Sequence, residues 1–401
     1  MPDSAPLLVF ADDWGRHPSS CQHLVRELLP RRQVVWVNTI GTRPPRLDRA
    51  TLRRGLEKAR QWLRPARRVS GRRPDVSLSG RQPDAARDNP LVLNPRMWPW
   101  LSSALDRRLN RWLLAKQLAP VVRDLPAPPV AVTTLPVVAD LTDVLPVARW
   151  VYYCVDDFSL WPGLDGAALR RLEERLVRRV DEVVAVSETL RDRLAGLTGR
   201  PVHLLTHGVD LDFWSDGTAR PPAALDGRER PLVVFWGVVD RRTDVAFVRR
   251  LAEDLPRGTV VLAGPHNDPD PALLRLPRVV ATGSLPFEQL PALAREAAVL
   301  VMPYADLPVT RAMQPLKLKE YLATGRPAVV RALPATRAWA DCLDLADSPE
   351  AFAAVVRRRL ATGLPAGQRA ARGRLADESW VAKARAFERR LWRRVPAPAL
   401  A

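Results

Sequence analysis

The sequence predicts an α/β fold built from two doubly wound parallel-sheet domains. Three observations predict it: the chain has 401 residues, short apolar runs alternate with helical stretches, and these runs fall into two blocks. One hydrophobic core rarely extends beyond about 250–300 residues, so two or three domains are expected. Continuous apolar strands separated by helices are typical of parallel sheets that are covered on both faces.

The two blocks predict eleven strands. In the first block they lie at residues 6–10, 34–37, 130–132, 150–153, 183–186 and 202–205. In the second block they lie at residues 232–235, 260–262, 279–280, 299–302 and 328–330. Residues 216–230 between the blocks are rich in Gly, Pro, Ala, Asp and Arg, which is typical of a linker. We therefore expect an N-terminal domain over 1–215, a C-terminal domain over 231–375 and a last helix within 376–401.

Composition excludes several classes of protein. No apolar run approaches the roughly 20 residues that span a bilayer, and the first ten residues do not resemble a signal peptide, so a cytoplasmic protein is expected. Cys21, Cys154 and Cys342 lack metal-ligand spacing and are expected to be buried, reduced thiols. The Gly-x-Gly-x-x-Gly motif and the Walker phosphate loop are absent, which disfavours nicotinamide, flavin and P-loop nucleotide binding.

The net charge of +18 is concentrated in one region. Residues 43–116 contain 19 Lys and Arg but 6 Asp and Glu. Within this region the apolar residues 52, 56, 59, 63 and 66 follow a helical period, with arginines between them, so a basic amphipathic helix is predicted over 52–69. Such a helix is either a solvated domain face or a docking site for an anionic membrane. Nucleic-acid binding is disfavoured because no nucleic-acid motif accompanies the charge.

The most informative stretch is residues 313–327, which precede the apolar run 328–330. Pro315 predicts a helix start and Gly325 a helix end. A helix N-terminus at the carboxyl edge of a parallel sheet attracts anions, and Lys317 adds a full charge in the first turn. Glu320, one turn later, is placed to reach a hydroxyl group. Phosphate and sugar hydroxyls together describe a nucleotide-sugar, although any αβ unit can also begin with a proline.

Residues 315–327 resemble the donor-site signature of the retaining GT-B glycosyltransferases of the "group 1" family. The resemblance implies two Rossmann-like domains facing a cleft, with the last helix crossing back to the first domain. It also implies that Glu320 binds the nucleotide ribose and that the backbone of Pro315, Leu316 and Leu318 cradles the diphosphate. Ala312 replaces a family glutamate that contacts the donor sugar. Some branches that make exopolysaccharide or teichuronic-acid-like polymers also lack this glutamate.

Further residues take roles from the same resemblance. The loop after the first strand brings Gly15 and Arg16 to the donor phosphate and the acceptor, although turn chemistry alone also explains its composition. Asp156 and Asp157 end a buried strand, and one of them is expected to face the reacting hydroxyl unless they only cap a loop.

The glycine loop after the second block's first strand contains Gly237 and is followed by Arg241 and Arg242. Either guanidinium can bind the donor diphosphate in a bidentate manner or lie on the surface as an ordinary charge. Arg311 is a further diphosphate candidate. Lys317 and an arginine would stabilise the departing diphosphate.

The expected activity is transfer of a sugar from a nucleoside-diphosphate sugar to a glycan or lipid-linked acceptor, with retention, in cell-surface polysaccharide biosynthesis. A hexosyltransferase-like enzyme is implied, peripheral at the inner face of the membrane if residues 52–69 dock there. An inactive nucleotide-sugar-binding scaffold and a nucleotide-sugar epimerase on the same fold are the alternatives. No metal or other cofactor is expected, because Asp268-Pro269-Asp270 is only a proline-rich match to the Asp-x-Asp motif.

Overall fold

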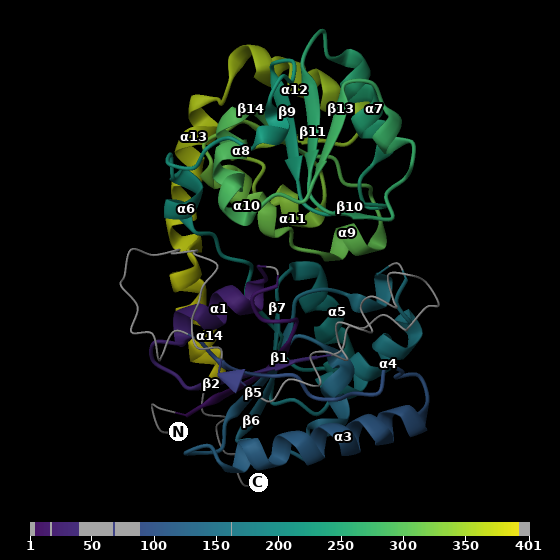
Figure 1. Cartoon of the computed structure of the whole chain (residues 1–401), viewed down its shortest axis with the longest axis vertical. Helices are drawn as coiled ribbons and strands as arrows, with labels where there is room; N and C mark the ends of the chain where they lie inside the picture. Colours follow the sequence, from purple (N-terminus) through teal and green to yellow (C-terminus); the bar gives the residue numbers. More distant parts are fainter. Residues whose placement is uncertain (1–4, 17, 40–66, 69–88, 162, 393–401) are drawn as a thin grey trace. The chain divides into compact units, whose positions relative to one another are not determined.

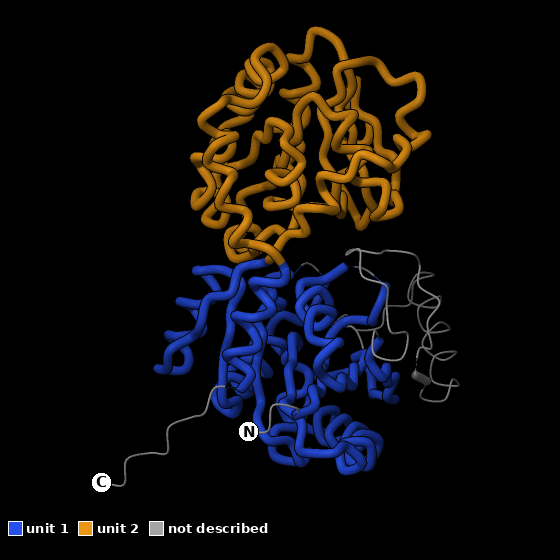
Figure 2. The backbone as a smooth tube through the Cα atoms, turned by 90° about the vertical axis from the view of Figure 1, so that its left-hand side faces the viewer, with its two compact units in different colours: residues 1–75, 81–207, 380–401 blue, residues 76–80, 208–379 orange. Residues whose placement is uncertain are grey.

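A computed structural model of the chain describes residues 5–16, 18–39, 67–68, 89–161 and 163–392 (Figure 1). The chain divides into two compact units (Figure 2). Unit 1 contains residues 1–75, 81–207 and 380–401, and unit 2 contains residues 76–80 and 208–379. Each unit has its own parallel sheet, so the predicted α/β fold with two doubly wound sheets is confirmed.

The described residues of unit 1 form an eight-stranded sheet in the order β3-β4-β2-β1-β5-β6-β7-β8. Its strands are β1 (Leu7–Ala11), β2 (Val34–Asn38), β3 (Arg67–Arg68), β4 (Leu91–Leu93), β5 (Val130–Thr133), β6 (Arg149–Cys154), β7 (Glu182–Ala185) and β8 (His203–Leu204). All neighbours are parallel except β3 and β4, and Leu7 pairs with both Val34 and Val130. The six predicted strands are confirmed, whereas β3 and β4 were not predicted because they are short.

Unit 1 covers this sheet with helices, four of which have a first turn capped by Ser or Asp. The helices are α1 (Ser20–Leu28), α3 (Ala104–Arg123), α4 (Gly166–Val177), α5 (Glu188–Thr198) and α14 (Trp380–Leu391), with the 3-10 turns η1 (Pro136–Leu141) and η2 (Phe158–Leu160). Ser19, Ser103, Asp165 and Ser187 each accept a bond from a first-turn amide. The strands β1, β2, β5 and β6 are buried along their whole length, as their continuous apolar sequences require.

The described residues of unit 2 form a six-stranded parallel sheet in the order β13-β11-β9-β14-β15-β16, and a short pair, β10 with β12. The strands are β9 (Leu232–Trp236), β10 (Val239–Asp240), β11 (Thr259–Ala263), β12 (His266–Asn267), β13 (Val279–Gly283), β14 (Ala297–Met302), β15 (Ala328–Arg331) and β16 (Asp344–Ala346). All five strands predicted for the second block are confirmed.

The helices of unit 2 include several that are only one or two turns long. The α-helices are α6 (Leu211–Ser215), α7 (Val245–Asp254), α8 (Leu290–Glu296), α9 (Pro308–Ala312), α10 (Leu316–Ala323), α11 (Pro334–Arg337), α12 (Pro349–Thr362) and α13 (Ala366–Ala371). The 3-10 turns are η3 (Ala223–Leu225), η4 (Leu273–Arg275), η5 (Phe287–Gln289) and η6 (Arg372–Glu378). Residues 216–230, which were expected to form a linker, lie in unit 2, and Leu225 is buried in its hydrophobic core.

Both sheets have a point at which the strand order reverses. In unit 1 this point lies between β1 and β5, and in unit 2 it lies between β9 and β14. At such a switch point the loops leave two neighbouring strands in opposite directions and open a crevice at the carboxyl ends of the strands, where ligands of doubly wound folds bind. A ligand site is therefore expected at the carboxyl ends of β1 and β5 or of β9 and β14.

The last described helix, α14, belongs to unit 1 and packs against α1. The ring of Trp380 stacks on His23 with a centroid distance of 4.5 Å, and Phe387 lies 5.2 Å from Tyr153. Arg32 donates to Glu388 at 3.1 Å. Burial lowers the pKa of His23 to about 3, so this histidine is a neutral part of the packing.

The predicted basic helix over 52–69 lies outside the described residues except at its end. There Arg67–Arg68 form β3, paired antiparallel with β4, so the predicted helix is wrong for these two residues. Sheet pairing with β4 overrides the helical period at this end of the segment. Within the described residues, none of the helices combines the length and the apolar character needed to cross a bilayer.

Candidate functional site

Helix α10 is anchored at the switch point of unit 2 by one tyrosine. The Tyr321 hydroxyl accepts a hydrogen bond from the Trp236 amide at 3.1 Å and donates to the Val301 carbonyl at 3.2 Å. Trp236 ends β9 and Val301 lies in β14, so Tyr321 joins the helix to both strands of the switch point. The predicted helix is confirmed: Pro315 is its N-cap residue, and Gly325 follows its end with a φ of +72°.

The first turn of α10 leaves two amides for an anion. Pro315 has no amide hydrogen, and the Leu318 amide donates to the Pro315 carbonyl at 3.2 Å. The first amides of an α-helix have no acceptor within the helix, and in α10 these belong to Leu316 and Lys317. The Leu318 side chain is fully buried in the core, so its role here is packing.

Lys317 places its ammonium group at the end of β9. Its Nζ donates to the Tyr304 hydroxyl at 2.6 Å and lies 4.6 Å from the centre of the Phe235 ring. An ammonium group over an aromatic face is stabilised by the ring quadrupole. Tyr304 follows β14 and Phe235 lies in β9, so these contacts hold the charge between the two strands of the switch point.

Gly237 makes room for this ammonium group. Its φ is +138°, which side-chain-bearing residues rarely adopt, and a Cβ at this position would lie 1.9 Å from Lys317 Nζ. Gly264, with a φ of +151°, allows a second close approach, because its Cβ would lie 1.9 Å from the Gly237 carbonyl oxygen. The loops after β9 and β11 therefore need glycine at both positions to lie against each other and against Lys317.

Glu320 lies one turn after Lys317 and is partly buried. Trp236 Nε1 donates a hydrogen bond to its carboxylate at 3.1 Å. Burial raises the pKa of the Glu320 carboxyl to about 7, while the bond from Trp236 and the charge of Lys317 oppose the rise. Near neutral pH this group therefore exists in both forms. Ionised, it accepts hydrogen bonds from hydroxyl groups, as a ribose-binding residue must.

The three predicted diphosphate-binding arginines differ in their surroundings. Arg242 is buried and forms an ion pair with Asp240, with contacts of 2.8 to 3.0 Å, and its Nη1 lies 4.0 Å from Met313 Sδ. Arg241 and Arg311 are exposed and pair with Asp268 at 3.0 Å and with Asp306 at 2.5 Å. Arg242 thus lies beside the segment that leads into α10, but an acid already balances its charge.

In unit 1, Gly15 and Arg16 lie in the loop after β1, at the switch point of that sheet. Gly15 has a φ of +75°, and its amide donates to Gln22 Oε1 at 3.0 Å. The same glutamine donates to Asp12 at 2.9 Å, and burial raises the pKa of Asp12. Arg16 is exposed and contacts Asp13 at 3.4 Å. The loop is thus fixed by Gln22, while Arg16 points to solvent.

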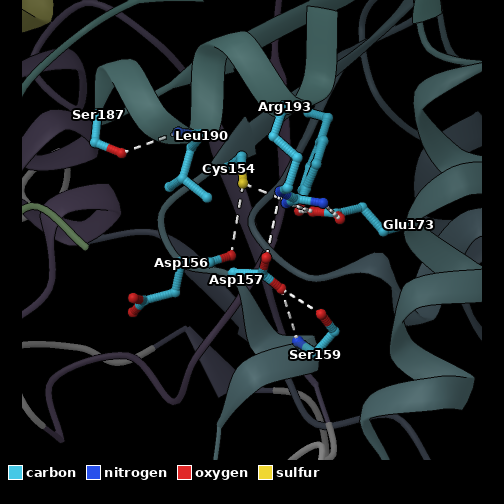
Figure 3. A network of polar contacts seen from close by, with 9 residues as sticks. Cys154, Asp156, Asp157, Ser159, Glu173, Ser187, Leu190 and Arg193 are labelled. Atoms are coloured by element: carbon cyan, nitrogen blue, oxygen red, sulfur yellow. Dashed lines mark hydrogen bonds and ion pairs between the residues drawn. The ribbon is translucent and has the colours of Figure 1, made fainter. Parts of the chain in front are cut away.

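Asp156 and Asp157 follow β6 and have different environments (Figure 3). The Asp157 side chain is buried, caps η2 through the Ser159 amide at 3.1 Å and pairs with Arg193 at 3.3 Å. The Asp156 side chain points away from this network (Figure 3), although its carbonyl oxygen accepts a contact from Cys154 Sγ at 3.5 Å. Asp157 is therefore built into the scaffold, and Asp156 is the better candidate for contact with a ligand.

Glu173 and Arg193 complete this network, and neither was predicted. Arg193 donates to Glu173 at 2.6 and 3.1 Å, and the Tyr152 hydroxyl donates to Glu173 at 2.7 Å. Burial alone would lower the pKa of Arg193, but the bonds and charge of Glu173 raise it. The arginine is therefore a permanent cation that fixes the loop after β6. The sequence could not predict this pair, because Glu173 lies in α4 and Arg193 lies in α5, and the two helices meet only in the folded unit.

Other features of the described residues lie apart from these positions. A cavity of about 320 Å³ in unit 1 has none of the predicted site residues in its wall, which is lined by Leu101, Arg107, Ala168, Arg171, Leu172, Glu174, Arg175 and Arg178. No three His, Cys, Asp or Glu side chains in the described part of the chain are grouped so that they could share a metal ion. The polar groups at the switch point of unit 2 are thus the candidate donor site.

Two residues of this candidate site escaped the sequence analysis. Trp236 is the last residue of β9, and Tyr304 follows the end of β14. The sequence signal for each is therefore only that a polar aromatic residue stands near the carboxyl end of a strand. Both form hydrogen bonds with side chains of α10: Trp236 donates to Glu320, and Tyr304 accepts from Lys317. They position the two side chains that the helix motif predicted.

Comparisons with known proteins bear on the fold and on the family of residues 230–362. Residues 230–362, which include β9 and α10, match the family model of the group 1 glycosyl transferases. A Bacillus subtilis (strain 168) protein described as a teichuronic acid biosynthesis glycosyltransferase, TuaH, is 30% identical over 176 residues. That match covers 42% of this chain and 44% of the length of TuaH.

Solved structures resemble nearly the whole chain at low identity. Sucrose-phosphate synthase from Thermosynechococcus elongatus has a TM-score of 0.66 at 16% identity, covering 96% of this chain and 98% of its own. Anabaena HepE, in complex with UDP and glucose, has a TM-score of 0.64 at 13% identity, covering 96% and 98%. Trehalose 6-phosphate synthase from Burkholderia multivorans has a TM-score of 0.64 at 15% identity, covering 97% and 98%. The chain therefore has the GT-B fold, and residues 230–362 match the group 1 glycosyl transferases.

Proposed function

We propose that this chain is a glycosyltransferase that binds a nucleoside-diphosphate sugar at the N-terminus of α10. One observation carries the proposal: the ammonium group of Lys317 and the carboxylate of Glu320 lie one turn apart on a helix whose start is fixed at the switch point of unit 2. The family match over residues 230–362 supports it, as does the UDP complex of HepE. The diphosphate would meet Lys317 and the amides of Leu316 and Lys317, and the ribose would meet Glu320.

The expected chemistry follows from this placement. When the sugar leaves, negative charge grows on the diphosphate, and fixed positive groups lower the barrier because they stabilise that charge more than they stabilise the bound donor. Lys317 is already held by Tyr304 and Phe235, so its ammonium group needs little reorganisation. Retention of configuration is proposed from the family resemblance. Arg242 takes part only if the diphosphate draws it away from Asp240.

We further propose that the acceptor is a glycan or lipid-linked hydroxyl in cell-surface polysaccharide biosynthesis. The similarity to TuaH supports this acceptor class. Asp156 is the acid proposed to contact the acceptor, because Asp157 is paired with Arg193. Ala312, in place of an acidic residue, favours a second candidate function, a nucleotide-sugar-binding protein without transfer activity.

Calorimetric titration with uridine, guanosine and cytidine diphosphates tests the donor site. For the nucleotide that binds, Glu320→Ala is expected to weaken binding by roughly 1–3 kcal/mol, the value of a hydrogen bond to a charged group. Glu350→Ala, at an exposed acid of the same unit, is the matched control. Equal affinity in wild type and a folded Glu320→Ala variant would remove Glu320 from the site. Incubation with labelled nucleotide-sugars then separates transfer from binding alone and from epimerisation.

A further inference from the structure

Exposed apolar side chains are concentrated in one part of unit 1. Eight large apolar side chains are exposed among the described residues, and five of them lie within fifteen residues of one another: Trp98, Trp100, Leu105, Leu109 and Trp112. Leu105 is 73% exposed and Trp112 is 57% exposed. Single exposed apolar residues are ordinary, but a contiguous group of this kind marks an interaction surface.

The group is held together by α3, which lies at the lower edge of unit 1 in Figure 1. Leu105, Leu109 and Trp112 are spaced i, i+4 and i+7 and share one face of the helix, while Leu114, Leu118 and Val122 face the core. A helix that is apolar on two opposite faces is expected to be covered on both. Within the described residues, only the inner face is covered.

The loop before α3 adds two tryptophans to the outer face. Trp98 Nε1 donates to Asp106 of α3 at 2.9 Å, and the Asn110 side chain bonds the backbone of both Trp98 and Trp100. The two indole rings lie 4.7 Å apart. Their exposure is therefore a fixed property of the folded unit, since buried Asn110 holds the loop that carries them.

Cations outnumber acids along α3, where Arg107 and Arg111 pair with Asp140 and Asp143. Arg108, Lys116 and Arg123 form no ion pair with an acid in the described part of the chain, and Lys116 Nζ lies 5.1 Å from the Trp112 ring centre. The acid of α3, Asp106, is used by Ser103 and Trp98. We call Trp98, Trp100, Leu105, Leu109 and Trp112, with Arg108 and Lys116, the outer face of α3.

We propose that the outer face of α3 docks on the surface of an anionic lipid bilayer. Trp side chains, with an apolar body and a polar N–H, suit the boundary between acyl chains and headgroups. Leu105 and Leu109 add apolar area, and Arg108 and Lys116 match negative headgroups. A second copy of the chain fits less well, because a self-complementary contact would bring Arg108 and Lys116 of both copies together, while Asp106, the acid of α3, already accepts bonds from Ser103 and Trp98.

The outer face of α3 contains none of the residues 52–69, and the inference extends the proposed function by locating where unit 1 would meet a membrane that carries a lipid-linked acceptor. It concerns only unit 1 and needs no nucleotide. A binding assay without donor or acceptor therefore tests it separately, and its failure would leave the donor-site proposal in place.

Vesicle sedimentation of the full chain is the first test, with phosphatidylcholine vesicles compared with vesicles that also contain phosphatidylglycerol. The wild type is expected to sediment with the anionic vesicles, and salt should weaken this because exposed charges are screened over about 8–10 Å. Replacing Leu105, Leu109 and Trp112 with serine should lower vesicle affinity roughly tenfold or more. The matched control replaces three exposed apolar residues elsewhere, Leu204, Leu274 and Val381, with serine and should bind like the wild type.

Two double variants test the electrostatic contribution to vesicle binding. Arg108→Glu with Lys116→Glu should lose the preference for anionic vesicles. Arg249→Glu with Arg257→Glu, at exposed positions of unit 2, makes the same change in net charge. This control variant should keep the preference for anionic vesicles. If both double variants lose binding equally, total charge rather than the outer face of α3 drives association, and the proposal is wrong.

Site-specific labelling shows which residues enter the bilayer. Cys21, Cys154 and Cys342 are buried, so a cysteine introduced as Leu105→Cys can be labelled selectively with an environment-sensitive fluorophore. Its emission should shift to shorter wavelength with anionic vesicles, whereas the same label at Leu274→Cys should not change. Sedimentation of the serine variant at the wild-type level, or lipid-free oligomers that this variant abolishes, would overturn the proposal.

Discussion

The indole Nε1 of Trp236 donates a hydrogen bond of 3.1 Å to the carboxylate of Glu320. Trp236 ends the first strand of unit 2, and Glu320 lies on the helix that begins beside it, so the bond fixes a side chain proposed to bind a nucleotide. Trp214 stacks on Trp236 with a centroid distance of 5.3 Å, which holds the indole in place. The carboxylate therefore lies in an apolar, aromatic setting that disfavours its charge.

This setting predicts how stability depends on pH. The pKa of Glu320 rises from 4.5 to about 7 on folding. The folded state then retains a proton that the unfolded state has released, so stability from this group is present below pH 4.5 and is lost as pH rises through 7. Denaturant unfolding at several pH values should show a loss of up to about 3 kcal/mol from this group. Glu320→Gln should flatten this part of the profile, and an unchanged profile would contradict the raised pKa.

Gly237 is predicted to act through Lys317. Gly237→Ala adds a methyl group where the Lys317 ammonium lies, so nucleotide affinity and transfer rate should both fall. Combining it with Lys317→Ala should cost less than the sum of the two single effects, because both changes remove the same group. Gly283→Ala, also at a positive φ but with no atom near the new Cβ, is the control for backbone strain. Additive losses in the double variant would show that Gly237 acts independently of Lys317.

Arg242 is predicted to contribute more to stability than to catalysis. Arg242→Ala leaves the buried carboxylate of Asp240 without its partner, which costs roughly 3–5 kcal/mol in comparable buried pairs. Arg241→Ala breaks only an exposed pair and should leave the melting temperature almost unchanged. Thermal unfolding measures both variants. A stable Arg242→Ala protein that binds nucleotide but has lost transfer would instead return Arg242 to the catalytic group.

The two adjacent acids after β6 are predicted to differ: Asp157 contributes to stability, and Asp156 to transfer. Asp157→Ala removes a partner of Arg193 and the cap of η2, so it should destabilise the chain by roughly 1–3 kcal/mol. Asp156→Ala leaves the Asp157–Arg193 pair and the cap of η2 in place, so it should destabilise the chain less than Asp157→Ala, and it should transfer more slowly if the acceptor binds here. Calorimetric unfolding and a transfer assay on both variants decide between them. Equal transfer rates for Asp156→Ala and the wild type would remove the acceptor role.

Eleven strands were predictable because each is a continuous apolar run, and all eleven are in the structure, whereas the short strands β3, β4, β10, β12 and β16 were not predicted. Helix α10 was predictable because proline, lysine and glycine mark its start, first turn and end. Pairings between distant residues were not predictable. Nothing in the sequence shows that Trp236 meets Glu320, that Lys317 lies against Gly237, or that Arg193 holds Asp157, because each pair is formed by sheet order and helix packing.

Charge was the weakest guide in the sequence. Arg241 and Arg242 are adjacent and chemically identical, yet one lies on the surface with Asp268 and the other is buried with Asp240. The outer face of α3 was also missed, since a helix with apolar residues on two opposite faces loses the one-sided pattern by which amphipathic helices are recognised.

The position of α14 in unit 1 has a consequence for the order in which the chain folds during synthesis. Residues 208–379 emerge from the ribosome as one continuous stretch and contain the hydrophobic core that the described residues of unit 2 form. Unit 1 is synthesised first. However, His23 of α1 and the ring of Tyr153 gain their contacts with Trp380 and Phe387 only after α14 has been synthesised. The unit translated first is thus completed last, and a chain arrested before α14 would present this apolar surface to chaperones and proteases.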